Sequence, residues 1–148
     1  MLLHHRPNPT GITCHRQTRH PHTPARLGPA GLATTHEPAV EHVAHALGLG
    51  IGAPVTVTSG VYQFAHRPVQ WVTTYTPPGQ TDRGRSVRVT ERVQVRDATP
   101  REQAELDLGA LASVMEIRRV CVDTVGKPVE LGLCVLVSGC HAVYEFGA

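Results

Sequence analysis

The chain has 148 residues, of which 41% are hydrophobic and 4% aromatic, and its formal net charge is +2. This length suits one domain with a flanking segment, because single domains commonly span about 100–150 residues. The longest apolar run, residues 131–137, is far shorter than the ~18–20 residues that cross a bilayer. The N-terminus lacks the charged and apolar regions of a secretory signal, so we expect a cytoplasmic protein.

Residues 1–36 differ in composition from the rest of the chain. They carry four arginines, six of the ten histidines and five prolines, but no acidic residue. A segment with so many helix breakers and so few large apolar residues cannot build a core. We therefore predict a disordered basic tail or linker remnant over residues 1–34 and a folded domain over residues 35–148. The tail arginines allow weak, salt-sensitive contact with nucleic acid, without sequence information.

The segment after the tail predicts a helix. Thr35 or His36 can cap this helix, and Pro38 suits its first turn. Apolar residues at helical spacing follow as far as Leu47, and glycines at 48, 50 and 52 then end the helix. A nucleotide-binding glycine loop follows a strand and opens a helix. The order is reversed here, so we expect no nucleotide cofactor.

Alternating and β-branched residues predict strands over most of the remaining chain. A hairpin covers residues 55–64 and 69–76, and a further strand covers residues 87–96 after a loop at 77–86. Thr99 and Pro100 predict the cap and first turn of a second helix that runs to Leu108. A second hairpin over residues 114–122 and 129–137, and a last short strand over residues 140–146, complete the domain.

The two helix–hairpin units resemble each other in sequence. Each contains a Leu-x-Leu exit from the helix, at residues 47–49 and 106–108, and a basic-Pro-Val turn, at residues 67–69 and 127–129. This pattern predicts two similar halves folded against each other, with a cleft between them.

Two strands carry polar side chains that bear on function. The strand at residues 69–76 holds glutamine, tryptophan, threonine and tyrosine side chains, which suit either a pocket for a small polar molecule or a strand with one wet face. In the strand at 87–96, valines alternate with polar residues, which predicts a valine side facing the core and places Glu91 in that inward register. A buried carboxylate is costly unless paired, so Glu91 lies near an open edge or faces a ligand or an arginine.

Neither the cysteines nor the histidines form a recognisable disulfide or metal motif. The four cysteines include no Cys-x-x-Cys pair, and we interpret them as reduced, small apolar side chains. The tail histidines lack the fixed spacing of a rigid site. His42 and His45 share a helical face but lack further ligands, so we interpret them as solvated. We predict neither a metal nor another cofactor.

Several motifs together point to a family. They are VTERVQVRDATPRE at residues 89–102, GKPVE at 126–130, VYEF at 143–146, and RPVQ and TTY at 67–70 and 73–75. This set resembles the UTRA domain, the effector-sensing half of GntR-type transcription regulators of the HutC subfamily. The resemblance extends from about Thr35 to Phe146.

The resemblance implies an α+β fold similar to chorismate lyase, an antiparallel β-sheet with flanking helices. It also implies a domain that binds a small-molecule effector, forms a homodimer, and acts on transcription through an attached or partner winged helix-turn-helix domain. Carried onto the matching positions, it gives a set of candidate effector-binding residues, which are Thr73, Tyr75, Glu91, Arg118, Glu130 and Tyr144.

Three features depart from the family's pattern. Residues 1–36 are too short and too rich in proline for the DNA-binding domain that precedes the sensor in the family, so we expect this chain to contact DNA only indirectly or weakly. The connection at residues 77–86 is shorter than usual. The first strand lacks the arginines that hold anionic effectors in many members, which favours a neutral effector over a phosphorylated one.

The leading hypothesis is a small-molecule-sensing domain of a GntR/HutC-type regulator, and not an enzyme. One alternative is a small lyase-like enzyme on the same fold, with acid–base candidates Glu91, Glu130, His66 and His141. Another is a ligand-free dimerisation module, in which residues 131–137 and the last strand present an apolar edge to a second copy.

Overall fold

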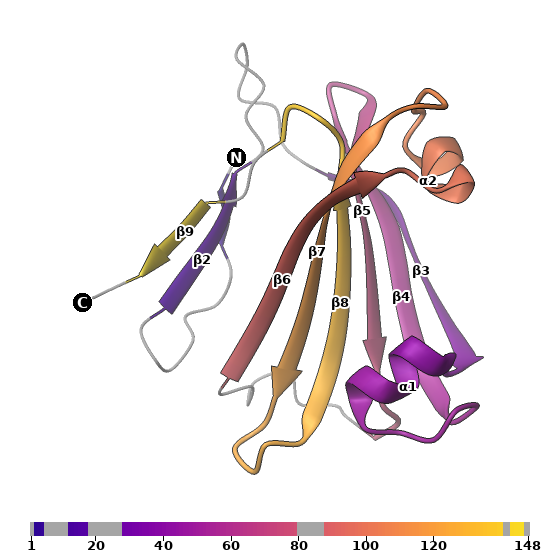
Figure 1. Ribbon diagram of the computed structural model, residues 1–148, viewed down its shortest axis with the longest axis vertical. Coiled ribbons are helices and arrows are strands. Elements are labelled where there is room, and N and C mark those ends of the chain that lie inside the picture. The colour runs from indigo at the N-terminus through magenta and orange to yellow at the C-terminus, as the bar shows by residue number, and fades with distance from the viewer. Residues whose placement is uncertain (1, 5–11, 18–27, 80–87, 141–142, 147–148) are drawn as a thin grey trace.

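A computed structural model describes residues 2–4, 12–17, 28–79, 88–140 and 143–146. Its main feature is a six-stranded antiparallel sheet with the strand order β3-β4-β5-β8-β7-β6 (Figure 1). The strands are β3 (Gly28–Pro38), β4 (Pro54–Phe64), β5 (Arg67–Thr76), β6 (Arg88–Asp97), β7 (Ser113–Val122) and β8 (Pro128–Leu136). The helices are α1 (Glu41–Leu47) and α2 (Pro100–Glu105). The predicted α+β fold class is confirmed.

A second, three-stranded antiparallel sheet consists of β1 (Leu2–His4), β2 (Ile12–Gln17) and β9 (Val143–Phe146). Disorder was expected over residues 1–34, whereas the structure assigns β1, β2 and the start of β3 to parts of that segment. Backbone pairing accounts for the difference, because every non-proline residue can join a ladder whatever its side chain. The domain boundary at residue 34 stays a prediction.

Strand β3 also occupies the residues where the sequence predicted the start of the first helix. Residues 34–36 pair with residues 56–58 of β4, and their β-branched threonines favour extended backbone. Helix α1 therefore starts later, at Glu41, after the N-cap Val40, which makes no side-chain hydrogen bond. Its end is as predicted, because Gly48 takes a φ of 64° at the C-cap.

Helix α2 begins as the sequence predicted. The Thr99 hydroxyl accepts a hydrogen bond from the Glu102 N–H, and the Glu102 carboxylate accepts one from the Thr99 N–H. This reciprocal capping box satisfies two backbone donors at the start of the helix. The helix ends at Glu105, short of the predicted Leu108.

Both predicted hairpins are present. Ala65 and His66 take φ angles of 49° and 63° in the β4–β5 turn, the left-handed pair that matches the twist of the flanking strands. In the β7–β8 turn, the Asp123 carboxylate accepts hydrogen bonds from the Val125 and Lys127 N–H groups. Most of the connection at residues 77–86 lies outside the described residues.

Each half of the sheet has the same order of elements, namely strand, helix and hairpin. One half is β3-α1-β4-β5 and the other is β6-α2-β7-β8, and they meet where β5 pairs with β8. Backbone hydrogen bonds also correspond: Ala39 N–H donates to Ala53 O at 2.7 Å, and Ala98 N–H donates to Ala112 O at 2.9 Å. The sequence repeat itself stays a prediction.

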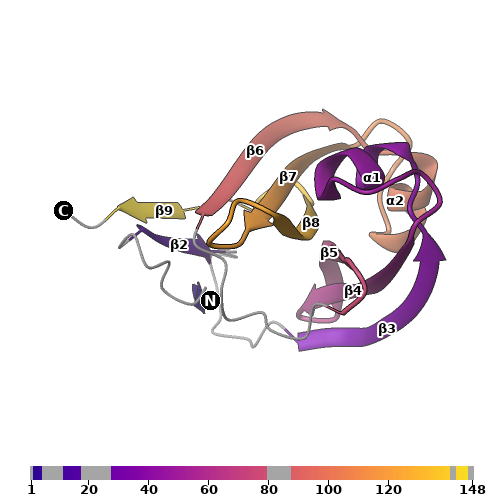
Figure 2. The ribbon, with the colours of Figure 1, turned by 90° about the horizontal axis from the view of Figure 1, so that it is seen from below.

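Both helices lie on the same face of the curved sheet, which we call the helix-bearing face (Figure 2). One apolar cluster joins α1 to one end of this face and contains Val43, Ala44, Leu47, Val55, Val57 and Leu131. A second joins the α2 region to the other end and contains Ala98, Leu106, Val114 and Val135. The opposite face carries a cluster of Ile117, Cys134 and Leu136.

The polar side of strand β6, and not its valine side, lies on the helix-bearing face. The sequence had predicted the reverse. Arg92 pairs with Arg118 and Gln94 pairs with Glu116, all on the helix-bearing face. The valines lie on the opposite face, where Val93 and Val95 are 45% and 72% exposed. The register expectation was therefore wrong, because alternation shows which residues share a face and not which face the helices cover.

Glu91 lies on the opposite face and is paired with an arginine. Glu91 Oε1 accepts a hydrogen bond from Arg119 Nε at 2.6 Å, and both side chains are nearly buried. Of the alternatives open for Glu91, the structure shows an arginine partner, and it also places Glu91 on an edge strand of the sheet.

Strand β8 lies inside the sheet, hydrogen-bonded to β5 on one side and β7 on the other. The dimerisation alternative supposed that residues 131–137 present a sheet edge to a second copy. Because β8 is paired on both sides, they cannot do so. The edges of the six-stranded sheet are β3 and β6. Among the described residues, no helix is long and apolar enough to span a membrane.

Candidate functional site

A row of residues, one from each strand, crosses the middle of the helix-bearing face. Register partners on neighbouring strands share a face, and the pairings place six residues side by side. We call this set the central row; in sheet order it consists of Ala33, Ser59, Thr73, Leu133, Arg118 and Arg92. The α1 cluster lies on one side of the row and the α2 cluster on the other. None of the six side chains is fully buried.

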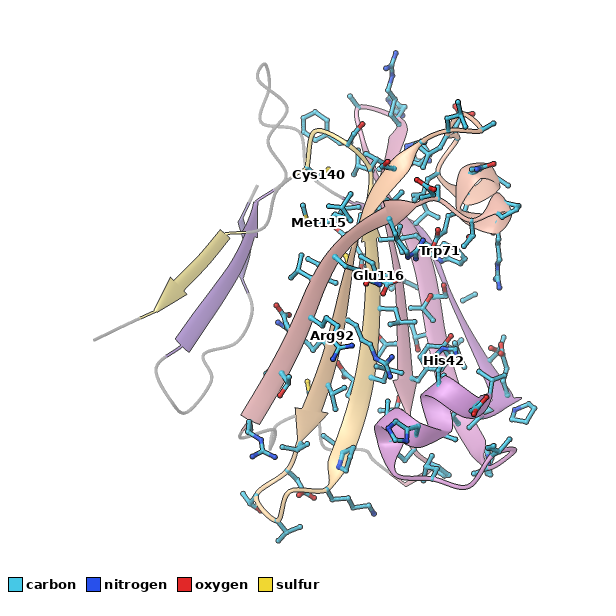
Figure 3. All side chains as sticks on the ribbon, in the orientation of Figure 1. His42, Trp71, Arg92, Met115, Glu116 and Cys140 are labelled. Atoms are coloured by element: carbon cyan, nitrogen blue, oxygen red, sulfur yellow. The ribbon has the colours of Figure 1, made fainter. Side chains whose placement is uncertain are left out.

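One half of the central row is cationic. Arg92 and Arg118 are direct register partners on β6 and β7. Arg118 Nη2 donates to the carbonyl oxygen of His42 in α1 at 3.3 Å, so its guanidinium lies on the helix side of the sheet. Figure 3 labels Arg92, which comes from β6, and His42, which lies on α1 at the lower end of the view.

The other half of the row carries hydroxyl groups. Trp71 Nε1 donates to Ser59 Oγ at 2.7 Å, and Ser59 Oγ lies 3.0 Å from Thr73 Oγ1. One of the two hydroxyl hydrogens is used in the Ser59–Thr73 contact, whichever group donates. The other hydroxyl hydrogen has no acceptor among the described residues, so the pair retains a donor for a ligand.

A network of charged side chains stands beside the row at the α2 end. Arg96 donates to both carboxylate oxygens of Glu102 at 2.7 Å, and to Glu116 Oε2 at 2.8 and 2.6 Å. Gln94 donates to the remaining oxygen of Glu116 at 2.9 Å. The Arg96 hydrogen bonds hold the pKa of Glu102 below its ordinary value despite burial, and the same contacts raise the pKa of Arg96.

Aromatic side chains border the hydroxyl half of the row. Arg101 of α2 lies over the Trp71 ring, 4.9 Å from its centroid, which is within the range of a cation–π contact. Tyr75 lies two residues from Thr73 on the α1 side and packs against the α1 cluster. Burial raises the pKa of Tyr75, Glu37 adds to the rise, and Arg101 opposes it. The phenol therefore stays neutral and can donate a hydrogen bond.

The structure brings together three of the six candidate effector-binding residues. Thr73, Tyr75 and Arg118 lie on the helix-bearing face, in or next to the central row. Glu91 and Glu130 lie on the opposite face, as their partners Arg119 and Cys121 do. Tyr144 lies in β9, whose backbone pairs with β2 rather than with the six-stranded sheet.

Sequence reasoning missed Ser59, Arg92 and Glu116. Their signal is the register: each is an even number of residues from a position already known to face the helices, since successive residues of a strand alternate between faces. Arg92 was passed over because the valine side of β6 had been assigned to the core.

The residues proposed for acid–base chemistry do not converge. Glu91 is paired with Arg119, Glu130 lies further along the opposite face, and His66 lies in the β4–β5 turn. His141 lies outside the described residues. Among the residues that the structure describes, no group of three or more His, Cys, Asp or Glu side chains could hold a metal ion.

Several solved structures with a similar fold are GntR-family transcriptional regulators or domains of them. A GntR-family transcriptional regulator from Bacillus cereus matches with a TM-score of 0.68 at 16% identity, over 85% of this chain and 98% of that one. The C-terminal domain of a GntR-family regulator from Bacillus anthracis str. Sterne matches with a TM-score of 0.65 at 21% identity, over 72% and 89%. The effector domain of PhnF from Mycobacterium smegmatis matches with a TM-score of 0.60 at 22% identity, over 74% and 78%.

No protein-family model and no curated protein sequence matches the chain. The structural matches define its fold, which is that of the C-terminal, effector-binding domains of GntR-family regulators and is consistent with a UTRA-like domain. The fold expected from the sequence motifs is thereby confirmed.

Proposed function

We propose that the six-stranded sheet with its two helices is the effector-sensing domain of a GntR-type transcription regulator, and that a small molecule binds at the central row. The single observation that carries this proposal is the polarity of the row. Apolar clusters occupy both ends of the helix-bearing face, yet its middle holds hydroxyl and guanidinium groups that are only half-buried or exposed. Polar groups that converge between apolar walls are typical of a small-molecule site. The shared fold with effector domains supports the same assignment.

The contacts of the row explain how a ligand would act at a distance. Arg118 reaches the backbone of α1, and Arg96 ties α2 to β6 and β7 beside the row. A ligand that binds Arg118 would act on its contact with α1, and a ligand that binds Thr73 would act on Ser59 and Trp71, over which Arg101 of α2 lies. We propose that this change is passed to a DNA-binding domain on the same or a partner chain, as in regulators of the HutC subfamily.

We also propose that the domain acts as a homodimer. Edge strand β6 supports this: its outer side has no strand partner in the six-stranded sheet, and Val93 and Val95 are exposed next to it. Sedimentation equilibrium should give twice the chain mass, and Val95→Lys should shift it toward one chain. A monomeric wild-type chain would contradict the homodimer proposal but would leave the ligand-site proposal unaffected.

The sensing proposal is tested by thermal unfolding of the chain against a panel of small metabolites. A ligand that binds only the folded state adds about 2.7 kcal/mol at one hundred times its Kd, so a genuine ligand raises Tm. Thr73→Val should reduce the shift, because it removes a hydroxyl of the row. Thr74→Val, the matched control, changes the next residue of β5, which points to the opposite face, and should keep the shift. Binding unaffected by Thr73→Val would contradict a ligand site at the row.

A further inference from the structure

The two arginines of the central row lie opposite each other without a carboxylate partner among the described residues. Like charges directly opposite each other on neighbouring strands are destabilising, and Arg92 and Arg118 are direct register partners. No carboxylate of the described residues lies within salt-bridge distance of either one. The sequence argument for a neutral effector rested on the first strand alone, whereas these cations come from β6 and β7.

The acids of the neighbouring strand β7 and of the edge strand β3 have hydrogen-bond donors of their own. Glu116 lies two residues from Arg118 on β7, but its Oε1 accepts from Gln94 and its Oε2 accepts from Arg96. Glu37, which acts on Tyr75, lies on the far edge strand β3 and accepts from the Thr35 hydroxyl at 2.7 Å. Neither carboxylate neutralises the arginine pair.

Most of the donors of the pair remain open. A guanidinium carries five N–H donors, and one hydrogen bond from Arg118, to the His42 carbonyl, involves a described residue. Arg92 makes no side-chain hydrogen bond to a described residue, and its side chain is exposed. Arg92 and Arg118 lie opposite each other on neighbouring strands, and the guanidinium group is the side chain that best matches a carboxylate or a phosphate, because both accept bidentate hydrogen bonds.

The hydroxyl half of the central row indicates which chemical group the other end of the ligand carries. Thr73 lies two strands from Arg118 across the sheet, which is roughly 10 Å at the backbone. The Ser59–Thr73 pair offers a hydroxyl donor and no charge. A ligand that spans the row therefore meets cations at one end and an uncharged hydrogen-bond donor at the other.

We infer that Arg92 and Arg118 form an oxyanion site, and that the effector is a small molecule with a carboxylate or phosphate group at one end and an uncharged acceptor at the other. This inference rests on the proposed sensing function for its biological meaning, but the anion site itself does not require that function.

The test is an NMR titration of the whole chain with inorganic phosphate, and separately with acetate, at constant ionic strength set by sodium chloride. The arginine Nε–Hε signals of Arg92 and Arg118 should shift and saturate. Arg118→Gln and Arg92→Gln should each weaken binding by at least about tenfold, because a charge-assisted contact is lost. Arg88→Gln is the matched control, since Arg88 is exposed on the same strand, about 13 Å from Arg92, and should leave binding unchanged.

The acetate and phosphate arms distinguish a carboxylate site from a phosphate site. Thermal unfolding of each variant checks that it is folded, and the two glutamine variants serve as independent tests if one of them unfolds. Shifts that do not saturate, or that are equal in Arg118→Gln and Arg88→Gln, would overturn the inference.

The same experiment separates this inference from the proposed function. If a neutral metabolite raises Tm and phosphate does not compete with it, sensing stands and the oxyanion site is wrong. If phosphate saturates the arginine pair but no metabolite raises Tm, the oxyanion site stands and the sensing proposal fails.

Discussion

Thr73 and Leu133 are register partners where the two halves of the sheet meet. Ser59 on β4 and Arg118 on β7 flank this pair at corresponding places in the two halves, and Ala33 and Arg92 flank it one strand further out. The two halves share an order of elements but differ in the chemistry of this row. Small side chains stand in one half where the other half has arginines. Packing of the helices does not require arginines in one half of the row and small side chains in the other. Recognition of a ligand with two chemically different ends does require such a difference.

The row predicts an unusual response of the ligand-free protein to mutation. Removing one arginine relieves a like-charge pair, so Arg118→Gln should leave the free energy of unfolding unchanged or raise it, by up to about 0.5 kcal/mol. Urea denaturation in phosphate-free buffer checks this. A loss well above 1 kcal/mol would show that Arg118 is mainly a structural group held by the His42 carbonyl.

Arg96 should behave in the opposite way. It links Glu102 and Glu116, so Arg96→Gln leaves two carboxylates on one face without their shared partner. We expect a loss of roughly 2–4 kcal/mol in urea denaturation. Arg88→Gln, an exposed change on the same strand, should cost under about 0.5 kcal/mol. Equal effects of the two changes would contradict the role of Arg96 in holding α2.

Glu102 predicts an acid-sensitive contribution to stability. Its pKa is lowered from an ordinary value of 4.5, first by the Arg96 hydrogen bonds. A lowered folded-state pKa contributes stability above the unfolded value and loses it as the pH falls through the folded value. Glu102→Gln keeps the capping box but removes the titration. The difference in stability between wild type and Glu102→Gln should therefore shrink below about pH 4.5. Parallel curves of Tm against pH would contradict this assignment.

Only glycine fits at position 60, because the backbone of β3 passes close to it. A Cβ at Gly60 would lie 2.5 Å from the Gly31 carbonyl oxygen and 2.6 Å from Leu32 Cδ2, next to the irregular register of β3. Gly60→Ala should destabilise the chain by about 1–3 kcal/mol. The control is Gly132→Ala on β8, where a Cβ meets nothing nearer than 3.8 Å. If both substitutions cost the same, β3 does not pack against β4 as described.

The sequence predicted elements whose signals are local. Helix α2 was predicted because Thr99, Pro100 and Glu102 encode a cap, and the hairpins because β-branched runs flank tight turns. Strand β3 was missed because its pairing with β4 depends on residues far along the chain, while Pro38 suggested a helix start. The face of β6 was reversed for the same reason, since only the helices decide which side is covered. Because of that reversal, Arg92 was not identified as a candidate site residue. Arg118, Thr73 and Tyr75 were identified from the resemblance to the family.

The most direct test of the central claim uses the single tryptophan of the chain. The Trp71 indole N–H donates to Ser59 Oγ beside Thr73, so its proton resonance reports on the row. A metabolite that raises Tm should shift this resonance in a saturable way, with the Kd found by calorimetry. A metabolite that raises Tm and binds by calorimetry while the indole resonance stays in place would show that the ligand sits elsewhere, and the account of the central row would be wrong.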